Sequence, residues 1–251
     1  MKKKYIYLIL TAFVFILCLK FGVFNFTEKY IKTYLYFKRN SFTITKFEHG
    51  NKKVLLIPMV HLNTENYYQK IKHNIDSLRN DGYVFFYEGI RHKEISVNAL
   101  ETDMRKFRKI TGYALMNYFD EENEADDALK IEGMVFQGNV DYGLNKNDIN
   151  ADYSLDELIR TYEENKGVIS LDKCDLDTPL GKKYSCSETN SENSKFMLED
   201  LRNEFLYTKL VDTDYSKIAV VYGAAHIRWL HLKLKHEGWQ HFNQFHPDYR
   251  K

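Results

Sequence analysis

Three apolar segments of the chain each end close to a titratable side chain. They are V-L-L-I-P-M-V before His61, V-F-F-Y before Glu88, and I-A-V-V-Y-G-A-A before His226. Two imidazoles and a carboxylate can bind a divalent ion, orient a water molecule or act as a general base. A single histidine or glutamate after a strand is usually structural, so a site is predicted only if the three segments lie side by side.

The segments have the length and composition of strands that are buried on both faces of a sheet. Between the first two, residues 65–80 carry apolar side chains at helical spacing. A strand, a helix and a strand in succession predict a βαβ unit, whose strands are parallel. Ligands of open parallel sheets bind beyond the carboxyl ends of the strands. We therefore expect His61, Glu88 and His226 to converge on one crevice if the third strand is a parallel neighbour.

The residues around the third strand suit such a site. Gly223 is expected to let the chain turn sharply at the strand end, because glycine has no Cβ. A helix should follow and stop at Gly238, which places His226 near its N-terminus. The helix dipole disfavours the imidazolium form there. A neutral imidazole is the form that a metal ligand or a general base requires.

The rest of the domain reads as further strands and helices. A β-hairpin is predicted over residues 42–61, helices over 98–118, 154–164 and 193–212, and a last strand over 239–245. Ser154 and Glu157 have the spacing of a helix capping box. Together these elements predict an α/β fold with a mostly parallel central sheet flanked by helices, in a domain spanning residues 42–251.

The N-terminal sequence predicts a membrane segment. Three lysines precede an uncharged apolar core over residues 5–19, and Lys20 can snorkel so that the apolar stretch reaches residue 26. The extended stretch of about 22 residues is long enough to cross a bilayer. Without a small-residue cleavage site, we expect an uncleaved signal anchor over 1–26 and a juxtamembrane segment over 27–41. The domain would lie outside the cytoplasm. The alternative is a cleaved signal peptide and a secreted domain.

The net charge bears on whether the chain binds nucleic acid, and the cysteines bear on the redox state of its compartment. The formal net charge of +1 gives no global field that would attract nucleic acid. Cys174 and Cys186 lie close together in a polar loop and could pair in an oxidising exterior, the alternative being two free surface thiols. The acidic run at 120–127 and the later histidines are interpreted as surface features; these histidines are His231, His236, His241 and His246.

The motifs P-M-V-H-L, F-F-Y-E-G and V-V-Y-G-A-A-H, in this order, resemble the TraB/PrgY/GumN family. That family includes the Tiki metalloproteases and is distantly similar to erythromycin esterases and ChaN-type haem-binding proteins. The resemblance covers residues 42–248. Gly223 to His226 matches the family's Gly-x-x-His motif fully. The first motif departs from it, because Pro58 stands where glycine is usual, and proline lacks an N–H and fixes φ.

The resemblance implies an EreA/ChaN-like fold and a metal-dependent peptidase that uses manganese or cobalt on a peptide or protein substrate. Under it, His61, Glu88 and His226 would be the metal ligands. The catalytic residues would be these three and Arg202, which matches an arginine that precedes the last motif. Arg202 would bind a substrate carboxylate or stabilise an oxyanion. Asp152 matches part of an Ala-Asp pair in the family, although it could also simply cap the following helix.

Two other functions fit the same residues. One is a non-catalytic membrane protein that binds or sequesters a peptide signal or a small ligand such as haem. The other is a metal-free, esterase-like hydrolase with a histidine base and Glu88. The chain has no His-Glu-x-x-His motif, so metal dependence rests on the resemblance alone.

Overall fold

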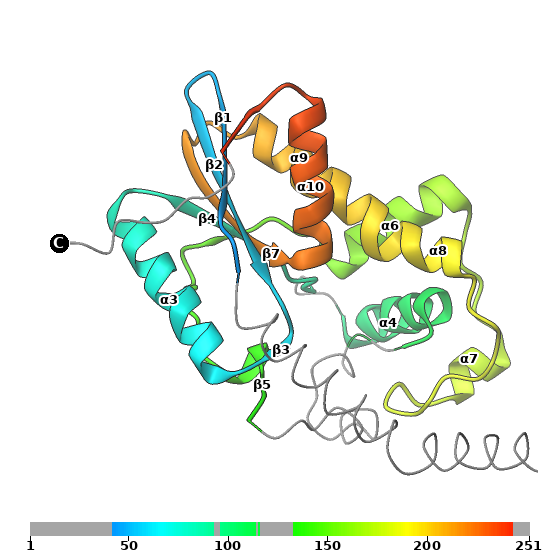
Figure 1. Cartoon of the computed structure of the whole chain (residues 1–251). Helices are drawn as coiled ribbons and strands as arrows, with labels where there is room; N and C mark the ends of the chain where they lie inside the picture. Colours follow the sequence, from blue (N-terminus) through cyan, green and yellow to red (C-terminus); the bar gives the residue numbers. More distant parts are fainter. Residues whose placement is uncertain (1–41, 93–95, 114, 116–132, 243–251) are drawn as a thin grey trace, which may run out of the picture. The chain divides into compact units, whose positions relative to one another are not determined.

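A computed structural model of the chain describes residues 42–92, 96–113, 115 and 133–242 (Figure 1). The chain divides into two units, residues 1–41 and 42–251, and every described residue belongs to the second. The predicted signal anchor at 1–26, the juxtamembrane segment at 27–41 and the acidic run at 120–127 lie outside the described residues. Among the helices that are described, none is both long enough and apolar enough to cross a bilayer.

The described residues form a six-stranded sheet with the strand order β6-β4-β7-β2-β1-β8. Its strands are β1 (Thr45–His49), β2 (Lys52–Met59), β4 (Val84–Tyr87), β6 (Ile149–Asn150), β7 (Lys217–Gly223) and β8 (Gln240–Phe242). β6, β4, β7 and β2 run parallel to one another, whereas β1 pairs antiparallel with both β2 and β8. The predicted hairpin and the predicted parallel arrangement of the three apolar strands are therefore confirmed.

Helices cover both faces of this sheet, which confirms the predicted α/β fold (Figure 1). α3 (Glu65–Asn80) packs on one face, and α9 (Leu201–Asp212) and α10 (Ala224–His236) pack on the other. A third apolar cluster joins α4 (Val97–Thr111), α6 (Leu155–Lys166) and the π-helical segment η4 (Phe196–Asp200). The short elements are β3 (Leu62–Asn63), β5 (Val135–Phe136), η3 (Gln137–Asn139), α7 (Lys173–Asp177) and α8 (Ser191–Lys195).

The alternation of side chains along a strand sorts them between the two faces of the sheet. On β4, Phe85 and Tyr87 contact the cluster under α3, whereas Phe86 contacts the cluster under α9 and α10. All three are buried, so the strand reads as one continuous apolar run. The same alternation directs Glu88, the residue after Tyr87, to the face that α9 and α10 cover.

α3 is amphipathic, and its hydroxyl groups hold the end of β2 in place.

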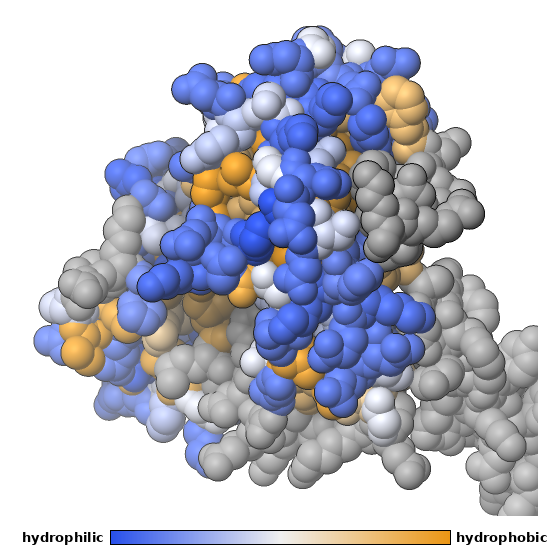
Figure 2. Space-filling view, turned by 90° about the vertical axis from the view of Figure 1, so that its left-hand side faces the viewer, coloured by the Kyte–Doolittle hydropathy of each residue, from blue (hydrophilic) through white to orange (hydrophobic). Residues whose placement is uncertain are grey.

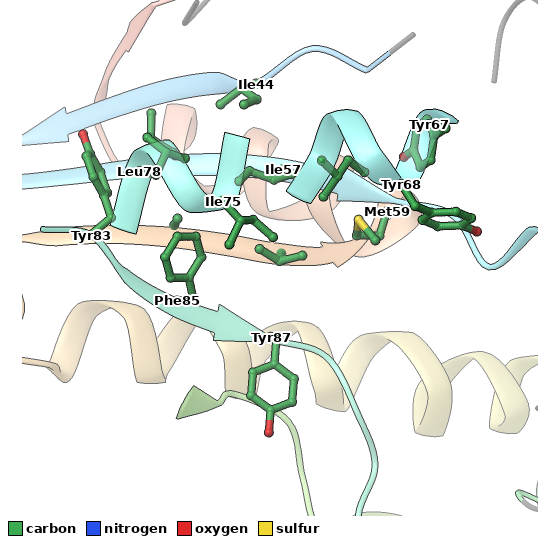
Figure 3. Packing of buried hydrophobic residues seen from close by; sticks show 14 residues of the cluster. Ile44, Ile57, Met59, Tyr67, Tyr68, Ile75, Leu78, Tyr83, Phe85 and Tyr87 are labelled. Carbon is green, nitrogen blue, oxygen red and sulfur yellow. The ribbon is translucent and has the colours of Figure 1, made fainter. Parts of the chain in front are cut away.

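Viewed from the side on which α3 lies in Figure 1, the surface is mainly hydrophilic, with apolar side chains in small separate patches (Figure 2). The inward side chains of α3 pack on the sheet (Figure 3). The hydroxyls of Tyr67 and Tyr68 donate to the carbonyls of Pro58 at 3.0 Å and Val60 at 2.9 Å. These bonds hold the chain just before His61.

Pro58 lies in β2 without ending the strand. β2 pairs with β7 up to the Met59–Gly223 pair, one residue beyond Pro58. On its other edge, β2 pairs with β1 only as far as Leu56. Among the described residues, no strand pairs with that edge at Pro58. A strand tolerates proline at such an open edge, because no N–H is needed there for a ladder.

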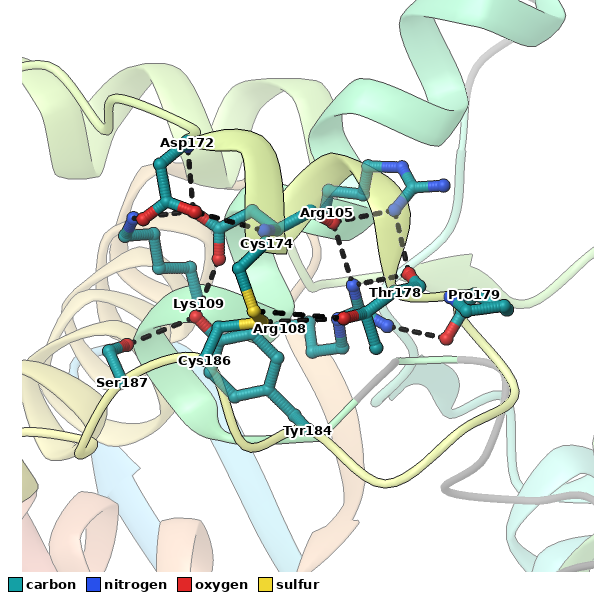
Figure 4. Close-up of a disulfide and its surroundings, with 11 residues drawn as sticks. Arg105, Arg108, Lys109, Asp172, Cys174, Thr178, Pro179, Tyr184, Cys186 and Ser187 are labelled. Carbon is teal, nitrogen blue, oxygen red and sulfur yellow. Dashed lines mark hydrogen bonds and ion pairs between the residues drawn. A yellow bond between two sulfur atoms is a disulfide. The ribbon is translucent and has the colours of Figure 1, made fainter.

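Cys174 and Cys186 form a disulfide, so of the two predicted states the structure contains the paired one (Figure 4). The closed segment contains α7 and is bound to α4 through hydrogen bonds. Arg105 and Arg108 each donate to the carbonyls of Asp175 and Thr178, near the C-terminal end of α7. The disulfide therefore stabilises a segment that would otherwise be tied mainly by polar contacts.

We expect the double substitution C174S/C186S to lower the free energy of unfolding by about 3 kcal/mol, because an open segment gains chain entropy on unfolding. Urea unfolding of the purified full chain, with and without a thiol reductant, measures the effect. Reductant should destabilise the wild type and leave the double variant unchanged. Equal urea midpoints for the wild type and the double variant in the absence of reductant would contradict this prediction.

Candidate functional site

Glu88, Arg202 and His226 are in mutual contact at the carboxyl ends of β4 and β7. Nη2 of Arg202 donates to Oε1 of Glu88 at 2.7 Å, and Nη1 of Arg202 lies 3.3 Å from Nε2 of His226. The same carboxylate oxygen, Oε1 of Glu88, is 3.6 Å from Nε2 of His226. The structure thus brings three of the four predicted catalytic residues together.

The carboxylate of Glu88 is ionised and held at both of its oxygens. Its second oxygen, Oε2, accepts a hydrogen bond from the backbone N–H of Gly223 at 2.6 Å. Burial raises the pKa of Glu88, but the charge of Arg202, the imidazole of His226 and the Gly223 N–H outweigh it, so the pKa lies below its ordinary value. A carboxylate in this state stabilises positive charge well and is a weak base.

Gly223 is required by the close approach of Glu88 and not by its own backbone conformation. Its φ of −51° and ψ of 139° are open to any residue. The turn from β7 into α10 does not by itself require glycine. A Cβ on Gly223 would lie 2.8 Å from Oε2 of Glu88, which is inside van der Waals contact.

Arg202 uses every one of its N–H groups within the protein. Besides its bonds to Glu88 and His226, it donates from Nε to Oδ1 of Asp152 at 3.0 Å and from Nη2 to Oδ2 of Asp152 at 2.6 Å. Nη1 also donates to the carbonyl of Leu198 at 3.2 Å. A guanidinium has five N–H donors, so Arg202 can contact a substrate only by giving up one of these bonds. The residue is 7% exposed, so it is a buried member of the cluster and not a solvated charge on the helix surface.

The π-helical segment η4 contributes to the position of Arg202. The N–H of Leu201, at the end of η4, bonds five residues back to the carbonyl of Phe196. This shift adds a residue to the turn and changes which face the following residues present. The Leu198 carbonyl accepts from the Arg202 side chain. The sequence predicted one uniform amphipathic helix over 193–212 and gave no signal for the π-helical turn.

His226 is buried and neutral, with a defined tautomer. Its Nδ1 lies 2.7 Å from Oδ1 of Asn203. Because Arg202 can only donate, Nε2 must be the acceptor in their contact, and Nδ1 then carries the proton and donates to Asn203. Burial lowers the pKa of His226 and so does Arg202, against the opposing effect of Glu88 and other nearby carboxylates. Asn203 belongs to this cluster, and no sequence pattern predicted its contact with His226, beyond its place next to Arg202.

Asp152 belongs to the cluster and does not cap a helix. In addition to Arg202, its Oδ2 accepts from the backbone N–H of Gly89 at 3.1 Å. α6 is instead capped by Ser154, whose backbone N–H bonds to Glu157 in the predicted capping box. The interpretation of Asp152 as a cap is therefore wrong, and its side chain links the chain after β6 to the chain after β4.

His61 lies apart from this cluster in the contacts that the described residues make. It is exposed, two residues beyond β2, and its carbonyl accepts from the N–H of Gln137 at 2.7 Å. Ile57, Met59 and Val60 all pack against the cluster under α3, so the alternation along β2 ends before His61. Among the described residues, the hydrogen bonds and ion pairs of Glu88, Arg202 and His226 do not include His61.

The two ligand atoms that a shared metal ion would need already contact Arg202. Oε1 of Glu88 and Nε2 of His226 are suitable in type for a divalent ion, but both contact the guanidinium. Within the described ranges, no group of three or more His, Cys, Asp or Glu residues is placed to hold a metal. In this arrangement the site fits a guanidinium and not a metal ion. The metal set of His61, Glu88 and His226 stays a prediction of the resemblance.

Two of the later histidines are less exposed than the sequence suggested. The rings of His231 and His241 lie 5.1 and 5.0 Å from the ring of Phe47, which is fully buried. These residues of α10 and β8 are half-buried, so each packs partly on Phe47 and keeps part of its surface exposed. His236 is exposed as predicted, and His246 lies outside the described residues.

Comparisons of the chain with protein-family models, with curated proteins and with solved structures found no match. The resemblance to the TraB/PrgY/GumN family rests on the three motifs quoted above.

We expect Gly223→Ala to lower the free energy of unfolding by about 1–3 kcal/mol, because the new Cβ displaces the Glu88 carboxylate from its backbone donor. Gly89→Ala is the matched control, since a Cβ there would lie 3.5 Å from the nearest atom, an ordinary contact. Urea unfolding compares the two variants. A loss of stability as large in Gly89→Ala as in Gly223→Ala would show that the steric argument is wrong.

Acid should destabilise the protein from about pH 6.5 downward through His226. An unfolded histidine takes up a proton near its ordinary pKa of 6.5, whereas folded His226 does so only at lower pH. Below pH 6.5 the unfolded state therefore binds more protons than the folded state. As a result, the free energy of unfolding decreases as the pH is lowered. The lowered pKa of Glu88 acts in the same direction below its ordinary value of 4.5.

Urea unfolding between pH 5 and 8 measures this dependence. His226→Gln should flatten the slope between pH 7 and 5, and His236→Gln, whose parent side chain is 85% exposed on the same helix, should keep it. An unchanged slope in His226→Gln would contradict the assignment.

Proposed function

We propose that this chain is a hydrolase that cleaves a peptide or protein substrate at the cluster of Glu88, Arg202 and His226. The observation that carries the proposal is the state of His226. It is a neutral imidazole, fixed in one tautomer by Asn203, with its Nε2 lone pair directed at the guanidinium of Arg202. A general base at neutral pH needs this protonation state and this orientation.

In the proposed reaction, a water molecule at Nε2 gives a proton to His226 and attacks the substrate carbonyl carbon. The imidazolium then returns the proton to the leaving amine. Glu88, with Oε1 at 3.6 Å from Nε2, stabilises the imidazolium while it exists. The low pKa of Glu88 argues for this electrostatic role and against the role of general base considered from the sequence.

Arg202 controls access to His226 in this proposal. Its contact with Nε2, at 3.3 Å, is the longest of its five bonds. Because the bonds to Asp152 and Glu88 hold the rigid guanidinium in place, this contact would break by a shift of the His226 ring, which would free the lone pair of Nε2 and one N–H of Nη1. The freed N–H could then donate to the oxyanion that forms on the substrate.

The metal-dependent form that the TraB/Tiki resemblance implies, with manganese or cobalt on His61, Glu88 and His226, would require Arg202 to leave both donors. We retain it as a variant of the same hydrolase proposal that metal analysis can separate. The location belongs to the proposal too: a single-pass membrane protein with its domain outside the cytoplasm, or a secreted form after cleavage. The disulfide supports an oxidising compartment.

A non-catalytic protein that sequesters a peptide signal or a small ligand such as haem is the second candidate. The complete pairing of Arg202 favours it, because a fully satisfied buried network can serve to fix the structure alone. His226 and Arg202 are each 7% exposed, so neither offers much surface to a substrate before the network opens.

Cleavage of a peptide library by the full chain, followed by mass spectrometry, tests the proposal. His226→Ala should lower kcat/KM by about 10²–10⁴-fold, the usual contribution of a general base, whereas His236→Ala on the same helix should not. Activity that survives chelation would support the metal-free form, and activity restored by Mn²⁺ or Co²⁺ the metal-dependent one. Peptide binding without any product would favour the sequestering protein.

A further inference from the structure

Two further histidines lie side by side outside the cluster of Glu88, Arg202 and His226. His231 lies on α10 and His241 on β8. The centroids of their rings are 4.7 Å apart, and the planes of the rings meet at 76°. Two imidazoles that come this close from different elements can bind one ligand between them.

The register of the sheet directs His241 toward α10. β8 pairs antiparallel with β1, which places His241 opposite Phe47. Side chains of residues directly opposite one another in a ladder lie on the same face of the sheet. Phe47 belongs to the cluster under α9 and α10, so His241 faces the helix that carries His231. Both imidazole rings lie against the ring of Phe47, which fixes them on one face of the sheet.

One nitrogen of this pair has no partner within the protein. Nε2 of His241 is buried and forms no hydrogen bond among the described residues. A buried polar atom in this state costs free energy, and a bound ion or water molecule is a common explanation for it. As the unprotonated nitrogen of a neutral ring, Nε2 offers its lone pair to a cation.

The separation of the two rings suits two imidazoles that share one metal ion. A nitrogen ligand lies about 2.0–2.1 Å from the metal and the ring centroid about 1.1 Å further out, so each centroid is about 3.1 Å from the ion. Two such ligands at an angle of about 90–110° have centroids about 4.5–5 Å apart. The observed 4.7 Å lies in this interval. The nitrogens can be aimed by rotation about χ2, a torsion that has broad minima in histidine.

The chemistry of the pair selects the class of ion. Imidazoles without carboxylate or thiolate ligands suit Cu²⁺, Ni²⁺ and Zn²⁺, whereas Mg²⁺ and Ca²⁺ require oxygen ligands. Burial lowers the pKa of His231, and so do the nearby His241 and Lys235. His231 is therefore held in the neutral form that binds a metal at neutral pH.

We propose that His231 and His241 form a two-histidine site for a divalent transition-metal ion, which ties β8 to α10. Water molecules would complete the coordination of the ion. β8 is three residues long, lies at an edge of the sheet and pairs only with β1 in the described part of the chain. An ion between the two histidines gives this strand a second attachment. The site does not depend on the proposed hydrolase function.

Titration of the full chain with Cu²⁺, Ni²⁺ and Co²⁺ tests the proposal, after purification without an affinity tag and removal of metals with a chelator. The wild type should bind Cu²⁺ more tightly than Ni²⁺, and Ni²⁺ more tightly than Co²⁺. Pulsed electron paramagnetic resonance of the first equivalent of Cu²⁺ should show two coordinated imidazoles. His231→Gln and His241→Gln should each lose this binding event. His236→Gln, whose parent side chain is exposed on the same helix, and His226→Gln should keep it.

Circular dichroism establishes that each variant is folded, and His231→Gln alone decides the test if His241→Gln does not fold. Binding that is unchanged in His231→Gln would indicate an adventitious ion only and overturn the proposal. Loss of the binding event in His226→Gln would assign the ion to the other cluster and overturn it as well.

Hydrogen exchange measures the attachment of β8. Ni²⁺ should slow the exchange of the backbone amides of residues 240–242 in the wild type and leave it unchanged in His231→Gln, because only an ion bound to both histidines restrains the strand. Binding of Ni²⁺ without this protection in the wild type would show that the ion does not bridge α10 and β8, and would overturn the proposal.

Discussion

The buried guanidinium of Arg202 is the constraint around which the site is arranged. A charge in this position costs several kcal/mol of desolvation unless ionic and hydrogen-bonding partners offset it. Glu88 and Asp152 supply two carboxylates, one after β4 and one after β6. His226 and the Leu198 carbonyl supply the remaining acceptors. The guanidinium therefore sets the relative positions of two strand ends, α9 and α10, and the removal of either carboxylate would leave part of a buried charge unpaired.

The site also depends on the sheet. Its parallel strands are apolar along their length, and the polar groups that follow them lie together at their carboxyl ends. β4 and β7 are neighbours and parallel, so Glu88 and Gly223 leave the sheet side by side. The absence of a Cβ on Gly223 lets the carboxylate reach the backbone N–H. That bond and the guanidinium together hold Glu88 ionised next to a neutral imidazole. Alternation along β4 decides that the carboxylate meets α9 and α10, and not α3.

The parts of the structure that the sequence could predict follow from periodicity. Continuous apolar runs predicted strands buried on both faces, and the βαβ unit made them parallel, which led to the proximity of Glu88 and His226. Other features depend on packing that no local pattern encodes. Asp152 has the sequence context of a helix cap, and only the burial of Arg202 explains its real partners. The π-helical turn before Arg202 changes the direction of its side chain, and it changes the direction of the adjacent Asn203 side chain as well.

His61 and His226 show why proximity in a topology differs from contact. Both histidines follow strands of the same parallel set. β2 continues one residue beyond Pro58, and Met59 at its end packs under α3. His226 instead lies on α10, which covers the opposite face of the sheet. The contacts of Arg202 also differ in their partners. Four of them bind the guanidinium to Glu88, Asp152 and the Leu198 carbonyl, and the fifth occupies Nε2 of His226. A site in which only that fifth contact breaks would expose a base and a donor together while the fold persists. A network that needed all five contacts for its stability would be purely structural, and this distinction separates the proposed hydrolase from an inert core.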